Sequence, residues 1–341
     1  MLPELALRNL VRALSLQRIL NFFKVELSFW LSKRLRRPIV WGRPYILTVE
    51  PASYCNLNCP FCVVGAKKLT RNSGFLDFDV YQQLINELGD DLIEILLFNQ
   101  GEPFLNPGLV DFIKLAKRKK IYTVISTNGH FLDDKKMIQN LINSGLDVLI
   151  VSLDGTTSES YQKYRRGGDF QRVLAGLQLL QQIKRECASD HPKLFLQFLM
   201  MRHNIHEMPR VRSLARQLGA ERILFKTLQV NNPTTDQQFL PTDPKFCRYR
   251  VNQDRLETKR QPDHVCGRLW RSSVLLSDSR VVGCCFDKNG DFALGQLTTT
   301  NSFQLIWQAP KYQQFRQRIL QQYAIGDLCS NCSEGIKIYY E

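Results

Sequence analysis

The 341-residue sequence lacks an uninterrupted apolar run long enough to cross a bilayer. Its most apolar helical pattern lies near residues 4–37, and charged residues at positions 12, 18, 24 and 26 interrupt it. A membrane-spanning helix needs about 20 consecutive, predominantly apolar residues. We therefore expect no transmembrane helix in this segment.

The sequence also lacks the pattern of a cleavable secretory signal, in which basic residues precede the apolar stretch. Here the basic residues cluster after it, at 33–37. Ten cysteines would suggest a disulfide framework in a short secreted chain. In a long chain without such a signal, closely spaced cysteines indicate metal sites instead. We expect a reducing cytoplasmic location and oxygen-sensitive metal centres.

A third absence concerns nucleic acids. The net charge is +14, yet no basic stretch is interleaved with aromatic residues in a recognisable nucleic-acid module. Residues 1–45 alone hold nine Lys and Arg against two Glu, a net charge of +7. Because half of the excess is confined to this short segment, we expect no nucleic-acid partner.

This basic segment, residues 1–44, predicts an amphipathic helical extension. Apolar residues recur at three- and four-residue steps, which places them on one helix face, and Pro38 ends the helix. They are Leu16, Ile19, Leu20, Phe23, Leu27, Trp30 and Leu31, flanked by Arg18, Lys24, Lys33, Arg34, Arg36 and Arg37. Two interpretations stay open: peripheral contact with the inner face of an anionic membrane, or packing against the protein itself or a partner.

From residue 45 to 229, short apolar runs alternate with helical patterns. Strands are expected near 45–50, 92–98, 121–126, 147–153, 194–200 and 222–227. Helices are expected near 77–88, 107–118, 133–143, 169–186 and 207–217. This alternation predicts an α/β domain with a parallel sheet and right-handed crossovers.

Three cysteines, Cys55, Cys59 and Cys62, lie within eight residues after the first predicted strand. Soft thiolates from one loop suit three irons of a four-iron cluster, and the loop supplies no fourth ligand. An open metal position is where substrate chemistry usually takes place. The alternative is a structural zinc site completed by a distant Cys or His, which would make the chain a zinc-binding scaffold.

The spacing C-x3-C-x-aromatic-C resembles the signature of the radical S-adenosylmethionine (SAM) superfamily. The resemblance implies a partial (β/α)6 TIM barrel over residues 45–229, with a [4Fe–4S] cluster on the three cysteines and SAM at the open iron. It also implies that SAM is cleaved reductively to a 5′-deoxyadenosyl radical, which abstracts a substrate hydrogen. A flavodoxin or ferredoxin would supply the electron.

Motifs at the ends of consecutive predicted strands carry the same resemblance. The run Asn99-Gln-Gly-Glu-Pro103 is similar to the family's Gly-Gly-Glu-Pro, with Gln100 in place of the first glycine. Ser126-Thr-Asn-Gly129, Ser152-Leu-Asp-Gly155 and Met200-Met-Arg-His-Asn204 follow the next three strands, at the end of the barrel where chemistry gathers. The resemblance implies SAM contacts from Phe61, Gly101, Glu102, Ser126, Asn128, Ser152, Asp154 and Asn204.

Residues 230–262 are polar and proline-broken, which predicts a connector to a second module at 263–341. Four cysteines of this tail are spaced C-x17-C-x44-C-x2-C: Cys266, Cys284, Cys329 and Cys332. The pattern resembles the twitch module, the shorter relative of the SPASM extension of radical SAM enzymes. It implies a small α+β module with one auxiliary [4Fe–4S] cluster. Cys285 is an alternative to Cys284, and a hairpin is expected to turn at Asp278-Ser279.

These patterns together predict an oxidoreductase-type radical SAM enzyme acting on a small polar or sugar-like substrate, whose auxiliary cluster accepts an electron. Alternatives are maturation of a ribosomal peptide and modification of a lipid-linked substrate at a membrane. Glu50, Lys226, His264 and Arg268 are candidate substrate anchors or proton acceptors, and none receives a catalytic role.

Overall fold

The computed structural model describes residues 15–230, 236–252, 255–259, 265–322, 325–330, 332 and 339–340. The chain divides into two compact units that alternate along the sequence. The first unit combines Met1–Tyr54, Leu69–Val124 and Pro262–Leu328, and the second combines Cys55–Lys68, Ile125–Gln261 and Cys329–Glu341. The domain boundaries predicted from the sequence stay predictions.

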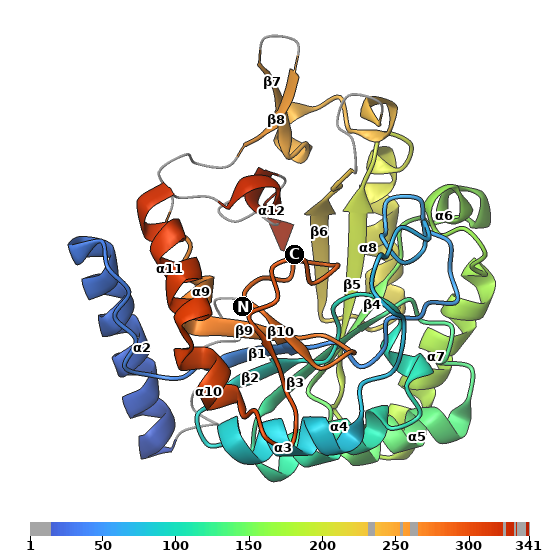
Figure 1. Ribbon diagram of the computed structural model, residues 1–341. Helices are drawn as coiled ribbons and strands as arrows, with labels where there is room; N and C mark the ends of the chain where they lie inside the picture. Colours follow the sequence, from blue (N-terminus) through green and yellow to red (C-terminus); the bar gives the residue numbers. More distant parts are fainter. Residues whose placement is uncertain are drawn as a thin grey trace. The chain divides into compact units, whose positions relative to one another are not determined.

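The first unit contains a mostly parallel run of strands (Figure 1). β1 pairs in parallel with β2 on one side and with β9 on the other, although β9 lies more than 200 residues later in the chain. β10 and β11 continue the run in antiparallel fashion beyond β9. In spatial order the strands are β11 (Gly295–Gln296), β10 (Arg280–Val282), β9 (Ser272–Leu275), β1 (Ile46–Val49), β2 (Glu94–Leu96) and the first half of β3 (Tyr122–Thr127).

In the first unit, helix α3 begins at a side-chain cap and buries an apolar face against α4. Asp77 caps α3 by accepting a hydrogen bond from the Asp79 backbone N–H at 2.8 Å. Tyr81 of α3 stacks on Phe112 of α4, with ring centroids 4.3 Å apart. The helices are α2 (Leu16–Leu35), α3 (Phe78–Leu88), the 3₁₀ turn η1 (Pro103–Leu105), α4 (Leu109–Arg118), α9 (Arg268–Arg271), α10 (Phe303–Gln308) and α11 (Pro310–Gln322). The short α12 (Gly326–Ser330) spans the boundary between the units.

The second unit continues from the last residues of β3 with parallel strands and ends in an antiparallel edge strand. These strands are β4 (Val148–Ser152), β5 (Lys193–Met200), β6 (Arg222–Thr227) and β12 (Tyr339–Tyr340). Its helices are α5 (Lys135–Ser144), α6 (Ser158–Tyr164), α7 (Phe170–Glu186) and α8 (Met208–Gln217), with 3₁₀ turns η2 (Ile205–Glu207), η3 (Gln237–Phe239) and η4 (Pro244–Phe246). A separate hairpin joins β7 (Tyr249–Asn252) to β8 (Arg255–Thr258).

The predicted α/β fold is confirmed. All six predicted strands are present as β1–β6, and each of the five predicted barrel helices is present as α3, α4, α5, α7 or α8. The predicted hairpin is also present as β9–β10, turning at Ser279, which has a φ of 67°. We did not predict α6, the β7–β8 hairpin inside the connector, or the pairing of β9 with β1.

The extension contains the predicted helix, α2, and no helix among the described residues is long and apolar enough to cross a membrane. One predicted position was wrong. Arg18 does not flank the apolar stripe but is buried on the opposite face, where its guanidinium donates to the Gly89 carbonyl at 2.9 Å. Burial lowers the pKa of Arg18, while Asp90 and Asp91 act against that shift.

Candidate active site

The three closely spaced cysteines lie in one loop of the second unit. Cys59 is buried, and Cys55 and Cys62 are partly buried. The Cys62 backbone N–H donates to the Cys59 carbonyl at 3.2 Å, and the Leu57 N–H points at the Cys55 sulfur at 3.4 Å. Burial raises the pKa of the Cys59 thiol to about 11; the nearby Arg165 guanidinium lowers it, and the Cys62 and Cys55 thiols raise it. The three thiols and Arg165 are therefore close enough for their charges to interact.

The loop is held in place by its backbone and by one aromatic side chain. The Asn58 N–H donates to the Arg166 carbonyl at 2.9 Å. A Cβ at Gly65 would lie 2.5 Å from the Cys59 nitrogen, so the chain packs against itself there. Phe61 stacks on Tyr164 with centroids 6.3 Å apart. Its predicted contact with SAM stays a prediction.

The donor set fits an iron–sulfur cluster. Thiolates are the usual ligands of such clusters, and in a cubane each thiolate binds a different iron. Within the described ranges, no three His, Cys, Asp or Glu side chains are placed to hold a single metal ion. Three thiols from one loop, without a fourth from that loop, match a [4Fe–4S] cluster with one iron left for SAM.

Asn128, at the end of β3, is oriented toward this loop. Its Nδ2 donates to Asn56 Oδ1 at 2.7 Å and lies 3.9 Å from the Cys55 sulfur. His130 Nε2 accepts from the Asp169 N–H at 2.8 Å, so His130 Nδ1 carries the proton and donates to Asn128 Oδ1 at 3.1 Å. Burial lowers the pKa of His130, which favours this neutral form. Sequence reasoning missed His130, whose only signal is its place after the Asn-Gly turn.

Asp154 and Asn204 are fully buried and bind the protein itself. One Asp154 oxygen pairs with Arg165 Nε at 2.6 Å, and the other accepts from the Leu199 N–H at 2.7 Å. Asn204 Nδ2 donates to the carbonyls of Asp154 and Leu199, and its Oδ1 accepts from the Met201 N–H at 2.8 Å. These side chains hold the ends of β4 and β5 together. Their predicted contact with SAM stays a prediction.

The two serines differ in exposure. Ser152 is buried, and its hydroxyl accepts from Gln197 Nε2 at 3.2 Å. Ser126, on β3, is partly exposed. Neither position contradicts a role in binding SAM, and both roles stay predictions.

Gly101 of the predicted SAM loop lies in the first unit, and only glycine suits its position. Its φ is +72°, and a Cβ would lie 2.4 Å from the Ala52 carbonyl oxygen and 2.6 Å from that of Tyr54. The Glu102 N–H donates to the Tyr54 carbonyl at 2.7 Å, and Glu102 Oε1 accepts from the Phe104 N–H at 3.3 Å. Close backbone packing, rather than a run of two glycines, therefore defines this loop.

We predict that Gly101→Ala lowers the free energy of unfolding by about 2 kcal/mol or more and weakens SAM binding, because its Cβ would displace two carbonyls of the adjoining segment. The matched control is Gly74→Ala, since a Cβ at Gly74 would meet nothing within 4 Å. Urea unfolding and equilibrium SAM binding measure the two effects. Equal stability and SAM affinity in both variants would refute this account of the loop.

Glu50, directly after β1, connects three segments of the first unit. Its carboxylate accepts from Arg71, from the Ser277 N–H at 3.2 Å, from Asn99 Nδ2 at 3.1 Å and from the Gln100 N–H at 3.2 Å. Burial raises the pKa of Glu50, and the Arg71 charge acts against that shift. These four hydrogen bonds assign Glu50 to positioning the Gly101 loop and the turn after β9.

Two other candidate anchors differ from Glu50 in exposure. Lys226 is partly exposed on β6, and Arg268 is exposed on α9. His264 lies outside the described residues.

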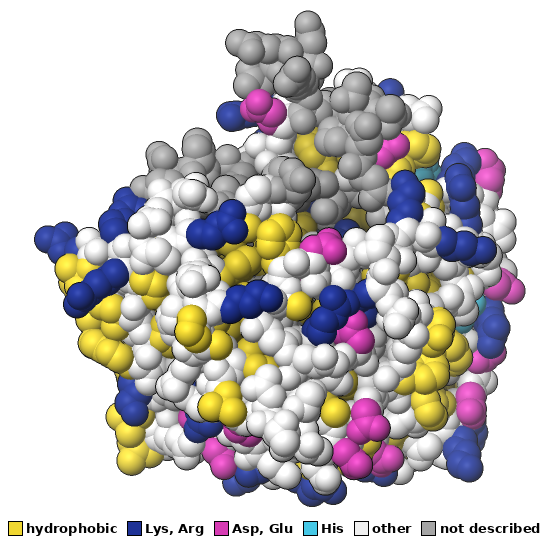
Figure 2. Space-filling model, viewed as in Figure 1, with side chains coloured by type: hydrophobic (Ala, Val, Ile, Leu, Met, Phe, Trp, Pro, Cys, Tyr) yellow, Lys and Arg dark blue, Asp and Glu magenta, His cyan; other side chains and the backbone are white. Residues whose placement is uncertain are grey.

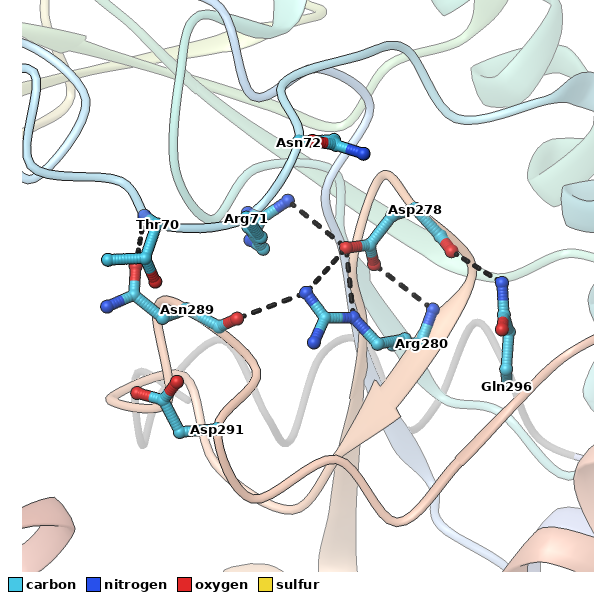
Figure 3. Close-up of a pocket in the computed structure, with 8 residues that line it drawn as sticks. All are labelled: Thr70, Arg71, Asn72, Asp278, Arg280, Asn289, Asp291 and Gln296. Carbon is cyan, nitrogen blue, oxygen red and sulfur yellow. Dashed lines mark hydrogen bonds and ion pairs between the residues drawn. The ribbon is translucent and has the colours of Figure 1, made fainter.

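A polar pocket of about 460 Å³ lies beside Glu50, where β1 and β9 end at the same edge of the sheet (Figure 3). Asp278 and Arg280 face each other in it at 2.7 Å, and Arg71 approaches Asp278 from the other side. The lining residues are Thr70, Arg71, Asn72, Asp278, Arg280, Asn289, Asp291 and Gln296. The sequence does not reveal this pocket, because its walls come from segments about 200 residues apart.

The predicted auxiliary site takes one pair of cysteines from each unit. In the first unit, Cys284 lies near Arg268, whose charge lowers the Cys284 pKa against a larger rise caused by Cys285 and burial. Cys285 instead packs on the apolar cluster of Val274, Leu276 and Val282. Cys266 precedes Arg268 by two residues, and the choice of Cys284 over Cys285 as the ligand stays a prediction. In the second unit, the Cys332 N–H donates to the Cys329 carbonyl at 3.2 Å. That all four hold one cluster stays a prediction.

Comparison with protein families identifies the class. Residues 49–202 match the model of the radical SAM superfamily, and residues 266–333 match that of the SPASM iron–sulfur cluster-binding domain. The chain therefore contains a radical SAM domain. More particularly, a SPASM-type C-terminal domain follows it. These two domains imply a SAM-binding [4Fe–4S] cluster, SAM itself and auxiliary iron–sulfur chemistry, as the cysteine patterns predicted.

Curated relatives match about half of this chain. The chain is 29% identical over 178 residues to the AdoMet-dependent heme synthase of Methanosarcina barkeri, a match covering 52% of this chain and 48% of the relative. It is 29% identical over 182 residues to the PqqA peptide cyclase of Gluconobacter oxydans, covering 53% and 48%. The chain thus spans about half the length of the curated relatives it matches, and these matches indicate an enzyme.

Solved structures share the fold. SuiB of Streptococcus suis bound to S-adenosylmethionine superposes with a TM-score of 0.60 at 13% identity, covering 85% of this chain and 71% of SuiB. BtrN in complex with AdoMet and 2-DOIA superposes with a TM-score of 0.52 at 18% identity, covering 85% and 93%. At these identities the likeness supports the partial-barrel fold and no particular reaction.

Proposed function

We propose that this protein cleaves SAM reductively and abstracts a hydrogen atom from a small polar substrate, in an oxidoreductase-type reaction. When bound, the cluster and SAM supply the electron and the carbon radical. The observation that carries the proposal is the trio of thiols, Cys55, Cys59 and Cys62, which share one loop beside the partly buried Arg165. The superfamily match over residues 49–202 supports the same chemistry.

The chain's own residues have separate parts in this proposal. The three thiolates hold the cluster, and the Arg165 guanidinium offsets their negative charge in a mostly apolar surrounding. The Asn128 amide and the backbone around Gly101 position SAM, together with Glu102 and Ser126. Phe61 closes the apolar side of the site, where it packs against Tyr164 and Phe239. Exclusion of water by these rings protects a radical from side reactions.

The polar pocket beside Glu50 supports a substrate rich in hydroxyl or amino groups. The Asp278 carboxylate accepts hydrogen bonds, whereas Arg280 and the amides of Asn72, Asn289 and Gln296 donate them. A sugar or aminocyclitol alcohol presents both kinds of partner. Loss of a hydrogen atom and an electron from such an alcohol, with transfer of the hydroxyl proton to solvent, gives a ketone. The auxiliary cluster on Cys266, Cys284, Cys329 and Cys332 would take up that electron.

A second candidate is maturation of a ribosomal peptide. It is favoured by the names of similar proteins, since one relative is a PqqA peptide cyclase and SuiB has been solved with its precursor peptide SuiA. The two candidates differ in what binds the pocket. A third candidate is modification of a lipid-linked sugar, whose sugar group would occupy the same polar pocket.

The proposal is tested by anaerobic assay of the full chain with deuterated substrates. We expect deuterated aminocyclitols or sugars, and not peptides, to stimulate 5′-deoxyadenosine formation and to pass deuterium into it. Stimulation by a peptide alone would overturn the choice of substrate while leaving SAM cleavage intact. Formation of no 5′-deoxyadenosine under any condition would overturn the reaction itself.

We further predict that Asp278→Asn combined with Arg280→Gln abolishes stimulation by the polar substrate, because it removes the charged pair that faces the pocket. The control is Arg172→Gln, which breaks a surface ion pair with Asp133 on the second unit. Substrate-dependent 5′-deoxyadenosine formation is the readout. If the double variant is stimulated as strongly as Arg172→Gln, the pocket is not the substrate site.

The electron donor and location follow from the same chemistry. Low-potential clusters need a reductant such as a flavodoxin or ferredoxin and a reducing compartment, so we propose a cytoplasmic enzyme. Turnover with a purified flavodoxin and its reductase in place of dithionite would support this electron donor. Turnover with dithionite, but none with the flavodoxin and its reductase, would reject it.

A further inference from the structure

The helix α2 packs with its polar face inward. Its buried residues are Arg18, Asn21, Val25, Ser28 and Ser32, four of them polar. Asn21 exchanges two hydrogen bonds with the Arg43 backbone, both 2.9 Å long. Ser32 forms a similar pair with the Ile39 backbone, at 3.0 and 2.8 Å. These bonds fix the rotation of the helix about its axis, so the opposite face points away from the unit.

That opposite face is an apolar stripe: Leu16, Leu20, Phe23, Leu27 and Trp30. Their exposed fractions run from 49% at Leu20 to 73% at Leu16. The alternating steps of four and three residues align them along the helix for about 20 Å. No other segment in the described part of the chain buries them. Figure 2 shows hydrophobic side chains next to dark blue Lys and Arg at the left, where Figure 1 places α2.

The charges around the stripe are positive. Lys24, Lys33, Arg34 and Arg37 are exposed. The single acidic residue of α2, Glu26, is neutralised by Arg271, whose two nitrogens donate to it at 2.7 and 2.6 Å. A stripe of large apolar and aromatic side chains bordered by basic residues is complementary to a negatively charged bilayer.

The dimensions of the helix also match a bilayer surface. α2 has 20 residues but is not apolar enough to cross a membrane. Because the apolar side chains follow one side of the helix in a straight line, they can all contact a membrane surface that lies parallel to the helix axis. Phe23 and Trp30 are side chains that favour the boundary between headgroups and acyl chains, and long basic side chains reach from there to phosphates.

We propose that the stripe of α2 binds an anionic membrane surface, with the helix lying in the plane of the interface. Phe23, Leu27 and Trp30 enter the acyl boundary, while Lys24, Lys33 and Arg34 contact lipid phosphates. The proposal stands independently of the reaction that the protein performs.

The test is flotation of the full chain with vesicles of phosphatidylcholine, alone or mixed with phosphatidylglycerol. We expect flotation with the anionic vesicles only, and weaker flotation at high salt because the basic contacts are screened. The variant Leu20→Ser, Phe23→Ser, Leu27→Ser, Trp30→Ser should reduce flotation at least tenfold without lowering the melting temperature. Replacing Lys24, Lys33 and Arg34 by Gln should remove the preference for anionic lipid.

Leu305→Ser is the matched control, because Leu305 is an equally exposed leucine of α10. It should float like the wild type. Three outcomes would overturn the proposal. The first is equal flotation of wild type and the four-serine variant, and the second is a lipid-free dimer that the four-serine variant disrupts. The third is a loss of stability in that variant, which would show that part of the chain itself covers the stripe. Flotation that depends only on residues 1–14, in a chain starting at Ser15, would also reject α2 as the binding element.

Discussion

Simultaneous replacement of Cys55, Cys59 and Cys62 by alanine is expected to remove about half of the bound iron and all SAM cleavage. The three thiols occupy one loop and supply every protein ligand that the proposed SAM cluster has. Without them SAM has no iron to bind and no source of an electron. Iron and sulfide analysis of anaerobically reconstituted protein, with chromatography of 5′-deoxyadenosine, measures both effects.

The iron that remains in this triple variant reports on the other cysteines. If Cys266, Cys284, Cys329 and Cys332 hold an auxiliary cluster, the variant keeps its colour and half of its iron. The control is Cys187→Ala, because Cys187 is an exposed residue at the end of α7. It should match the wild type in iron content and activity. Zinc in place of iron and sulfide in the wild-type protein would instead support a scaffold.

Arg165→Met is expected to lower the free energy of unfolding by about 3–5 kcal/mol, because it leaves the fully buried Asp154 carboxylate without its cation. Chemical denaturation measures the loss. The matched control is Lys163→Met, two residues before Arg165. It breaks an exposed ion pair with Glu159 and should cost less than about 1 kcal/mol.

Arg165 also provides a readout that stability alone does not give. Its charge lies close to the Cys59 thiol, so its removal should make the cluster harder to reduce and lower its midpoint potential. The double variant Asp154→Asn, Arg165→Met should regain part of the stability but keep the lowered potential. A single variant with wild-type stability and potential would show that the pair neither stabilises the unit nor adjusts the cluster.

The parts of this protein that follow from local sequence were predictable. β1 to β6 were predicted correctly because buried strands alternate with amphipathic helices, and the spacing of hydrophobic residues differs between the two. The cysteine loop and the Gly101 loop were found because their spacing is specific. By contrast, the pairing of β9 with β1 and the pocket that it creates depend on contacts between segments some 200 residues apart, for which the sequence gives no local signal.

Side-chain roles were harder to predict than positions. Asp154 and Asn204 were singled out correctly as strand-end residues, but their partners are Arg165 and backbone groups, which only the packed structure reveals. In α2 the spacing of apolar residues identified the apolar face, but not whether this face points toward the rest of its unit or away from it. Asn21 and Ser32 bind the backbone of the segment that follows the helix, and no local pattern indicates these bonds.

The most direct test of the central claim, that one iron on the Cys55–Cys62 loop is left open for SAM, is electron paramagnetic resonance of the reduced protein with and without SAM. A variant with Cys266 and Cys284 replaced by alanine isolates the signal of the first cluster. The account predicts that added SAM changes the g-values of this signal, because its amino and carboxylate groups become ligands of the open iron. An unchanged signal at saturating SAM would contradict it.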